Sequence, residues 1–338
     1  MSKTVFPLHH DDYRRSGPDD LVSLPGPPDQ LPLILPRRKL EIVTLCILES
    51  TTLHLSGPTG SGKSTLIEYV SNPRNFHAVL HGMGRESSKA PLLYPIQMAT
   101  FDSPSELYSR RALRGGETFD EDSILVKALK DAVQRTDCHP VLWLREMGRV
   151  ASAQIQGALL DLITPHPILL PDGCRIQVNA CWIADSNYQA EHDATHTLVP
   201  FDEALKRRFS HQVTLPWLPP EQEAEVLRHL LSQRLTSEQR RGMSEETLAK
   251  TVKLGASIRA RKAEGVLTTL VPPTIYSYLA FLELLARSDW SVWDAACCTL
   301  LGNASQQDAK LLPAVFNEAF GLEVAPDEMA ESTAGSLF

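Results

Sequence analysis

The chain has 338 residues, of which 43% are hydrophobic and 22% are charged, as is ordinary for a globular protein. Its net charge of −8 argues against general binding to nucleic acid or to an anionic membrane surface, because proteins with those partners usually carry a basic excess. No stretch reaches the roughly 18–20 consecutive apolar residues of a membrane-spanning helix, so we expect no membrane partner.

The cysteine pattern indicates neither a zinc site nor a disulfide framework. None of the six cysteines forms a CxxC pair, and Cys297 and Cys298 are simply adjacent. Zinc sites and disulfide-rich domains use regularly spaced cysteines instead. The first residues are polar and lack the apolar core of a signal peptide. We therefore expect reduced thiols and a cytoplasmic location.

The first 37 residues are rich in Pro, Asp and Arg, which predicts an extended arm or linker without packed structure. His9 and His10 precede two aspartates and are either metal ligands or part of a solvated polar tail, and the tail is favoured. His192 and His196 have HxxxH spacing, but no third ligand is near in sequence. We expect no metal site at either pair.

Residues 38–216 alternate strand-like apolar runs with helix-like periodic segments. The strand-like runs include TTLHLSG, PLLYPIQMAT, HPVLWLRE and RIQVNACWIAD. The helix-like segments include STLIEYVS, SILVKALKDAV and QIQGALLDLIT. This alternation is typical of an α/β fold around a mostly parallel sheet.

From residue 217 the strand-like runs stop. The segment PPEQEAEVLRHLLSQRL begins with prolines, which suit a helix start, and continues with apolar residues at helical spacing. Further helices are expected near 246–262, 274–287, 291–301 and 308–320. The sequence thus predicts a smaller all-helical domain over residues 217–321. Residues 322–338 are expected to form a frayed acidic tail.

The segment LHLSGPTGSGKSTLIEYV carries the phosphate-binding motif GxxxxGK[ST] between a predicted strand and a predicted helix. Its glycines let the backbone approach phosphate oxygens, and the N–H groups of the loop and the helix start point at negative charge. Lys63 is expected to reach the β- and γ-phosphates of ATP, and Ser64 to bind Mg²⁺. The predicted nucleotide-binding residues are Gly57, Pro58, Thr59, Gly60, Ser61, Gly62, Lys63, Ser64 and Thr65.

A second candidate for chemistry follows the strand HPVLWLRE. VLWL is apolar throughout, as in a central parallel strand, and Glu146 follows it directly after Arg145. Glu146 is either a general base for the water that attacks ATP or an ordinary carboxylate at a strand end. The catalytic interpretation is favoured by the segments that surround it.

Together these segments resemble the MoxR branch of the AAA+ ATPases, and most closely the subgroup that includes gas-vesicle and rubisco-activating ATPases. LREMGRVASAQIQGALLDLIT has the family's spacing of strand, acidic pair, turn and helix, but Arg145 replaces the aspartate and Gly148 the asparagine. The resemblance covers about residues 38–321. It implies a P-loop NTPase core of the AAA+ type followed by an all-helical lid domain.

The resemblance also assigns roles to further residues. DSNY resembles the sensor-1 segment, which implies that Asn187 lies beside the γ-phosphate. VPFDEALKRRFSHQVTLPWLPPEQE resembles the segment with the arginine finger, which implies that Arg208 reaches the nucleotide of a neighbouring subunit; the other interpretation is a basic surface cluster. Arg149 acts across that interface or forms a structural salt bridge. ITPHPILLPDGCRIQVN resembles the hairpin ahead of sensor 1.

Two positions depart from the active pattern of the family. Arg145 brings a positive charge towards Mg²⁺, which costs a few kcal/mol per charge pair at roughly 4–6 Å and an effective dielectric near 20. Its side chain either swings away or contacts a phosphate. Thr274 stands where the family often has a sensor-2 arginine, and Arg259 is a candidate to compensate. We therefore expect ATP binding with weak or partner-dependent hydrolysis.

The resemblance implies a ring of subunits, most often a hexamer, with ATP between Lys63 of one subunit and Arg208 of the next. Such a machine remodels or assembles a client protein, often through an adaptor with a von Willebrand A-type domain. One alternative is a scaffold or switch subunit that binds ATP and hydrolyses it poorly. Another is a DNA-associated AAA+ ATPase of a mobile-element or defence system, against which the acidic charge counts.

Overall fold

The computed structural model groups the chain into two compact units. One holds the described residues up to Pro216 apart from Thr59–Ser61, and the other holds those from Trp217 onward together with Thr59–Ser61. The described residues are 4–5, 17, 21–24, 33–164, 166–170, 172–187, 199, 201–241, 244–302 and 304–322. The two histidine pairs of the N-terminal arm and of the HxxxH segment lie outside them, as does the predicted tail beyond residue 322. None of the helices in these ranges is both long and apolar enough to cross a membrane.

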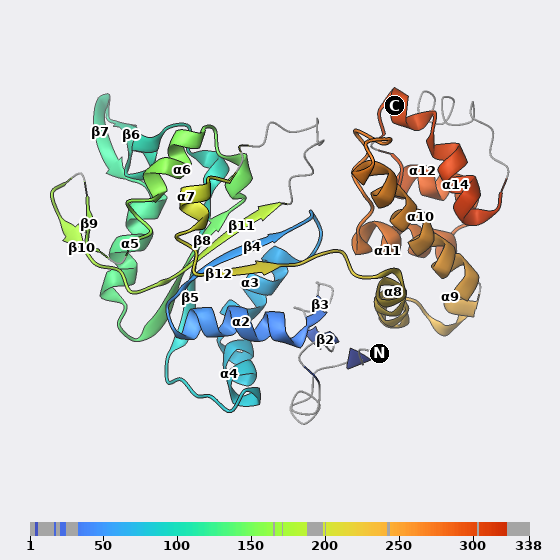
Figure 1. Ribbon diagram of the computed structural model, residues 1–338, viewed down its shortest axis with the longest axis horizontal. Coiled ribbons are helices and arrows are strands. Elements are labelled where there is room, and N and C mark those ends of the chain that lie inside the picture. Colours follow the sequence, from blue (N-terminus) through green and yellow to red (C-terminus); the bar gives the residue numbers. More distant parts are fainter. Residues whose placement is uncertain are drawn as a thin grey trace. The chain divides into compact units, whose positions relative to one another are not determined.

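The first unit is built on a five-stranded sheet in which every pairing is parallel, so the expected α/β class is confirmed (Figure 1). From one edge to the other the strands are β12 (His211–Thr214), β4 (Thr52–Gly57), β11 (Cys181–Asn187), β8 (Cys138–Arg145) and β5 (Ala90–Gln97). The strand that leads into the phosphate-binding motif, β4, therefore lies between two others. Its neighbour β11 separates it from β8, the strand that precedes Glu146.

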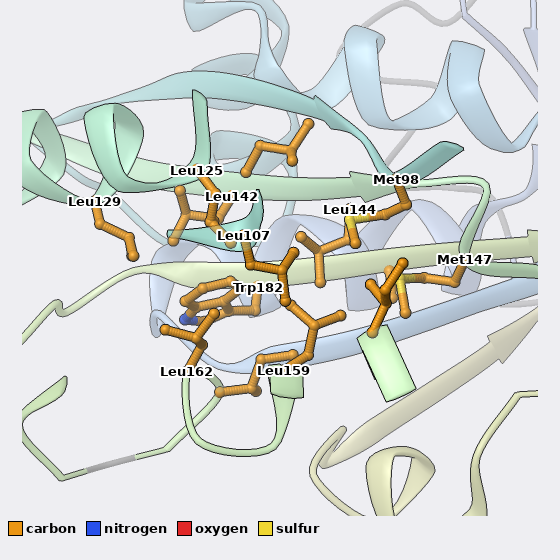
Figure 2. Packing of buried hydrophobic residues seen from close by; sticks show 14 of the residues in the cluster. Met98, Leu107, Leu125, Leu129, Leu142, Leu144, Met147, Leu159, Leu162 and Trp182 are labelled. Atoms are coloured by element: carbon orange, nitrogen blue, oxygen red, sulfur yellow. The ribbon is translucent and has the colours of Figure 1, made fainter. Parts of the chain in front are cut away.

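Side chains of β8 alternate between two hydrophobic clusters, because successive residues of a strand point to opposite faces of a sheet. Val141 and Trp143 belong to a cluster shared with α2, α3 and α4, while Leu142 and Leu144 belong to one shared with α5 and α6. Figure 2 shows side chains of the second cluster. The helices of this unit are α2 (Arg37–Leu48), α3 (Lys63–Ser71), α4 (Pro73–Gly82), α5 (Ile124–Gln134), α6 (Ala153–Leu159) and α7 (Glu203–Lys206), with 3₁₀ turns η1 (Met98–Thr100), η2 (Pro104–Leu107) and η3 (Met147–Arg149).

Helix α5 shows why these segments become helical. The hydroxyl of Ser123 accepts a hydrogen bond from the backbone N–H of Val126, which satisfies one of the free donors at the helix start. Leu125, Ala128, Leu129 and Ala132 of α5 are buried, at the three- and four-residue spacing of one helix face. That face packs into the cluster of Figure 2.

Two antiparallel hairpins extend this unit. β6 (Ser109–Arg114) pairs with β7 (Glu117–Asp122) across Gly115 and Gly116, whose φ angles of 62° and 88° suit a tight hairpin turn. β9 (Ile168–Leu169) pairs with β10 (Arg175–Ile176). The second hairpin confirms the one expected within ITPHPILLPDGCRIQVN.

The N-terminal arm was expected to lack packed structure, and this expectation is wrong for the residues described there. β2 (Leu21–Leu24) pairs antiparallel with β3 (Leu33–Pro36), and β1 (Thr4–Val5) pairs parallel with β2. Val22 and Leu35 are buried in the cluster that covers α2 and α3. The many prolines hid two short apolar runs, LVSL and LPLIL, whose burial favours ordered strands.

The second unit is helical. An aromatic group in its core includes Trp293, Phe316 and Phe320, with ring centroids 4.9 Å apart for Trp293 and Phe316 and 4.6 Å apart for Phe316 and Phe320. Asp308 is buried and accepts backbone hydrogen bonds from residues 268–270, which fixes the connection before α11. The helices are α8 (Pro220–Arg234), α9 (Ser237–Arg241), α10 (Glu245–Ala263), α11 (Ile275–Arg287), α12 (Val292–Thr299), α13 (Gln306–Ala309) and α14 (Leu312–Phe320).

Candidate nucleotide-binding site

Four adjacent parallel strands bring polar residues to one edge of the sheet. Gly57 ends β4 and is the Cα partner of Asn187, which ends β11. Arg145 ends β8 and is the Cα partner of Gln97, which ends β5. Glu146 follows directly. In open parallel sheets ligands bind outside the carboxyl ends of the strands, so this edge is the candidate site.

The motif GPTGSGKS forms the turn from β4 into α3. Gly60 and Gly62 have φ angles of 81° and 88°, a left-handed conformation that other residues rarely adopt. Gly62 is the N-cap of α3, and no side chain caps this end. The first N–H groups of the helix therefore remain available to an anion.

Lys63 is buried at the start of α3, where its Nζ donates hydrogen bonds to the carbonyl oxygens of Gly57 and Pro58, both at 2.8 Å. Burial lowers the pKa of Lys63 to about 8, while the negative charges of Asp185 and Glu146 act in the opposite direction. A buried ammonium group at this loop is stabilised further by an anionic ligand.

The hydroxyl groups of the loop fit a phosphate and its metal ion. The Oγ atom of Ser61 is buried and has no hydrogen-bond partner. Among the described residues no hydrogen bond is made by the side chains of Ser64 or Thr65, which are half-buried. The described ranges contain no cluster of three His, Cys, Asp or Glu side chains for a metal ion. Mg²⁺ bound with ATP does not need such a cluster, because it takes most ligands from phosphates and water.

Glu146 is held in a strained backbone conformation. Its φ and ψ angles of 55° and 51° are left-handed, which is uncommon for a residue with a side chain. Its Oε2 accepts a hydrogen bond of 2.8 Å from Nε2 of Gln97, and its Oε1 lies 3.6 Å from a guanidinium nitrogen of Arg149. Such strain persists only where surrounding contacts impose it, and it clusters at functional sites.

Gln97 was not among the predicted site residues. The sequence contains no motif around it, and only the pairing of β5 with β8 brings it beside Glu146. The polar Gln97 at the end of PLLYPIQ was the one available signal.

The side chain of Arg145 stacks on an aromatic ring. Its guanidinium carbon lies 4.5 Å from the ring centroid of Trp143, two residues earlier on the same face of β8. Cation–π contacts of this kind contribute about 0.5–2 kcal/mol. In this structure the guanidinium of Arg145 is therefore held by Trp143, and its expected contact with a phosphate stays a prediction.

Asp185 is a second residue that sequence analysis did not select. It lies on β11, is 4% exposed, and its Oδ1 accepts hydrogen bonds from Nε1 of Trp143 at 2.6 Å and from the backbone N–H of Glu146 at 3.4 Å. Burial raises the pKa of Asp185, against the effects of the Trp143 hydrogen bond and the Lys63 charge. The segment WIADSN did contain the signal, since an aspartate at the end of an apolar strand is unusual.

The remaining predicted residues of this unit differ in exposure. Asn187 is half-buried beside Gly57. Arg208 and Arg149 are exposed, and Arg208 lies between α7 and β12, where its backbone carbonyl accepts a hydrogen bond of 2.8 Å from the hydroxyl of Thr52. Within the part of the chain that is described, the guanidinium of Arg208 has no ion pair.

In the helical unit, Thr274 and Arg259 have structural roles. Thr274 is the N-cap of α11 and forms a capping box with Ser277. Arg259 donates two hydrogen bonds, of 2.9 and 2.6 Å, to the buried carboxylate of Glu223. It also donates one of 3.0 Å to the hydroxyl of Tyr278, and it stacks on Trp217 at 5.0 Å. Arg259 is thus fully committed within its own unit, which argues against the suggested compensation for Thr274.

No protein-family model matches the chain, and no curated protein shows significant similarity to its sequence.

Proposed function

We propose that this protein is a P-loop ATPase of the AAA+ type, similar to the MoxR branch, that binds ATP with Mg²⁺ at the carboxyl edge of its parallel sheet. One observation carries the proposal. The glycine loop with Lys63, the acid Glu146 and the amide Asn187 lie at the carboxyl ends of strands β4, β8 and β11, which are adjacent in the sheet. Residues that can bind the phosphates, orient the attacking water and contact the γ-phosphate then all lie at one edge of the sheet.

Each residue has a role that follows from its position. The loop N–H groups and Lys63 bind the phosphates, and Ser64 supplies a hydroxyl for the metal ion. Glu146 orients and deprotonates the attacking water, while the side-chain amide of Asn187 donates a hydrogen bond towards the γ-phosphate. Mg²⁺, when bound with ATP, neutralises charge on the β- and γ-phosphate oxygens.

We propose that hydrolysis is slow without a partner. Gln97 and Arg149 hold the carboxylate of Glu146 in place, and releasing one of these contacts lets it reorient towards the attacking water. Arg145 adds a positive charge where related ATPases carry an acid. A partner that draws Gln97 or Arg149 away from Glu146 raises the rate.

In the assembled state, ATP lies between two copies of the chain arranged in a ring, most simply a hexamer, and Arg208 supplies the positive charge that stabilises the transition state of the neighbouring site. The exposure of Arg208 supports this role. The ring remodels or assembles a client protein through the helical unit, which acts as the lid, and an adaptor with a von Willebrand A-type domain fits this scheme.

A second candidate function is a nucleotide-gated scaffold that binds ATP and turns it over too slowly to drive remodelling. The stacking of Arg145 on Trp143 and the capping role of Thr274 favour it, because both residues serve structure at positions where the family that the chain resembles has catalytic charge.

Titration with a fluorescent ATP analogue tests the binding proposal. Lys63→Ala removes charge-assisted hydrogen bonds to phosphate worth about 1.5–3 kcal/mol, which predicts binding weaker by about 10- to 100-fold. Lys89→Ala, at an exposed lysine of the same unit, is the matched control and leaves affinity unchanged. Equal affinities of wild type and Lys63→Ala would overturn the proposal.

Phosphate release and light scattering separate the two candidate functions. A remodelling ATPase forms ATP-dependent oligomers, and its turnover falls at least about 10-fold in Glu146→Gln and Arg208→Ala. A scaffold forms the oligomers with turnover near background in wild type and in both variants. A monomer with and without ATP contradicts the role of Arg208.

A further inference from the structure

The candidate site lacks an acid on one strand and has one on the neighbouring strand. β8 ends in Arg145, where the resemblance implies an aspartate. On β11, Asp185 follows Ala184, the residue that pairs with Leu144 of β8, so it lies one step further along, beside Arg145. It is also the Cα partner of Leu55, two residues before the glycine that opens the phosphate-binding loop.

The side chain of Asp185 lies on the same face of the sheet as α3. Trp143 and Ile183 belong to the cluster that α3 covers, and Asp185 is two residues beyond Ile183, which returns it to that face. Its hydrogen bond with Nε1 of Trp143 agrees with this placement. Lys63 and Ser64 begin α3 on this same side.

The two oxygens of the Asp185 carboxylate have different surroundings. Both hydrogen bonds, from Trp143 and from the Glu146 backbone, go to Oδ1. Within the described residues Oδ2 receives no hydrogen bond, and no ion pair forms at Asp185. A carboxylate buried to this extent usually has further donors or a cation beside it.

The nearest cationic side chain does not pair with this carboxylate. Asp185 and Lys63 interact electrostatically, and Asp185 has a larger effect than Glu146 on the pKa of Lys63. Yet the ammonium of Lys63 is bonded to the loop carbonyls and makes no salt bridge with Asp185. The guanidinium of Arg145 stacks on the ring of Trp143 and makes no ion pair with Asp185 among the described residues.

We propose that Asp185 supplies the metal-side carboxylate of the nucleotide site, so that the acid absent at Arg145 has moved to the adjacent strand. The inference rests on the proposed binding of ATP with Mg²⁺. Trp143 has two positioning roles in it: the indole N–H fixes Oδ1 of Asp185, and the ring holds the guanidinium of Arg145. Oδ2 is left for the metal ion or a water bound to it.

A purely structural role for Asp185 explains less. As an acceptor for Trp143, a neutral asparagine or serine would serve without the cost of burying a charge. Asp185→Asn separates the two roles, because its amide oxygen can still accept from Trp143 while the charge is gone. Asp161→Asn, at an exposed aspartate of the same unit, is the matched control.

The experiment measures ATP affinity by titration, with Mg²⁺ and with EDTA in its place, and Mn²⁺ binding to the ATP complex by electron paramagnetic resonance. In wild type and Asp161→Asn, ATP binds at least about 10-fold more tightly with Mg²⁺ than with EDTA. Loss of a residue that supports a metal ion typically weakens metal binding by a factor of this size. In Asp185→Asn this gain falls below about 2-fold, and Mn²⁺ binds correspondingly more weakly. In EDTA, Asp185→Asn binds ATP at least as tightly as the other two proteins, because it removes a negative charge near the phosphates.

If Asp185→Asn keeps the full effect of Mg²⁺ while Lys63→Ala loses ATP binding, the inference is overturned and the proposed function stands. If wild type binds no ATP, both are overturned. A second comparison applies even if Asp185→Asn does not fold. Arg145→Met and Arg145→Asp both remove the positive charge, but only the second adds an acid. With Asp185 as the metal-side acid, their Mg²⁺ effects differ by less than about 3-fold, and a larger difference overturns the inference.

Discussion

Glu223 of the helical unit and Asp185 of the α/β unit are both buried carboxylates, 1% and 4% exposed, and burial raises the pKa of each. Glu223 receives two hydrogen bonds from Arg259, one on each oxygen. Asp185 receives both of its hydrogen bonds on one oxygen. Both oxygens of Glu223 thus accept a hydrogen bond within the helical unit, whereas Oδ2 of Asp185 accepts none from the described residues.

The difference in hydrogen bonding distinguishes a carboxylate whose partners lie within its own unit from one with an oxygen left for a ligand. In the helical unit, the two residues considered for the site have structural roles: Arg259 pairs with Glu223, and Thr274 caps α11. At the sheet edge, polar groups remain half satisfied and the backbone of Glu146 is strained. Proteins accept such local cost mainly where a ligand completes the arrangement.

Replacing each carboxylate by its amide tests this comparison directly and has the largest expected effect. Glu223→Gln leaves the guanidinium of Arg259 without its carboxylate, which costs about 3–5 kcal/mol of unfolding free energy. Asp185→Asn changes stability by less than about 1 kcal/mol, because Trp143 keeps an acceptor and a buried charge is removed. Hydrogen exchange of α8 and α10, and of β8 and β11, measures the two effects separately.

The matched control is Glu318→Gln, whose exposed pair with Arg261 contributes at most about 1 kcal/mol. The comparison breaks if Asp185→Asn is destabilised as much as Glu223→Gln.

A pH-dependent effect is expected next, from His54 on β4. Its ring stacks on Phe201 at 4.4 Å and hydrogen-bonds with Ser186 at 2.8 Å, and burial, followed by the charge of Lys206, lowers its pKa from 6.5 to about 4. Because the pKa of His54 is lower in the folded than in the unfolded state, the neutral ring contributes fully to the free energy of unfolding above about pH 6.5. This contribution is lost as pH falls towards 4, by about 3 kcal/mol.

Urea unfolding between pH 7.5 and 4.5 measures the loss. His54→Gln is expected to remove most of the acid-induced decline, whereas His211→Gln, at an exposed histidine of the same unit, keeps it. A decline of equal size in wild type and His54→Gln means that another group carries it.

The smallest expected effect concerns the cap of α11. Thr274→Ala removes the side-chain acceptor for the N–H of Ser277 and costs about 1 kcal/mol, while Thr274→Ser keeps the cap and stays within a few tenths of wild type. Hydrogen exchange of the first turn of α11 detects the change. If both variants lose the same stability, the methyl group and not the cap is responsible.

Most of the elements could be predicted from the sequence. The strand ending at Gly57, the helix opened by Lys63 and the strand ending at Arg145 carry hydrophobic periodicity and a loop motif that depend on neighbours in the chain. The arm was the exception, because proline content outweighed two short apolar runs whose burial depends on contacts with α2.

The sequence by itself determined the α/β class, the glycine-rich loop between β4 and α3, and the position of Glu146 after VLWLR, because each depends on consecutive residues. Only the tertiary structure decided which side chains meet. Gln97 joins Glu146 through the register of β5 and β8, and Asp185 comes beside Arg145 through the order of β8 and β11. Strands distant in sequence become neighbours through crossover connections, so residue spacing along the chain does not encode these contacts.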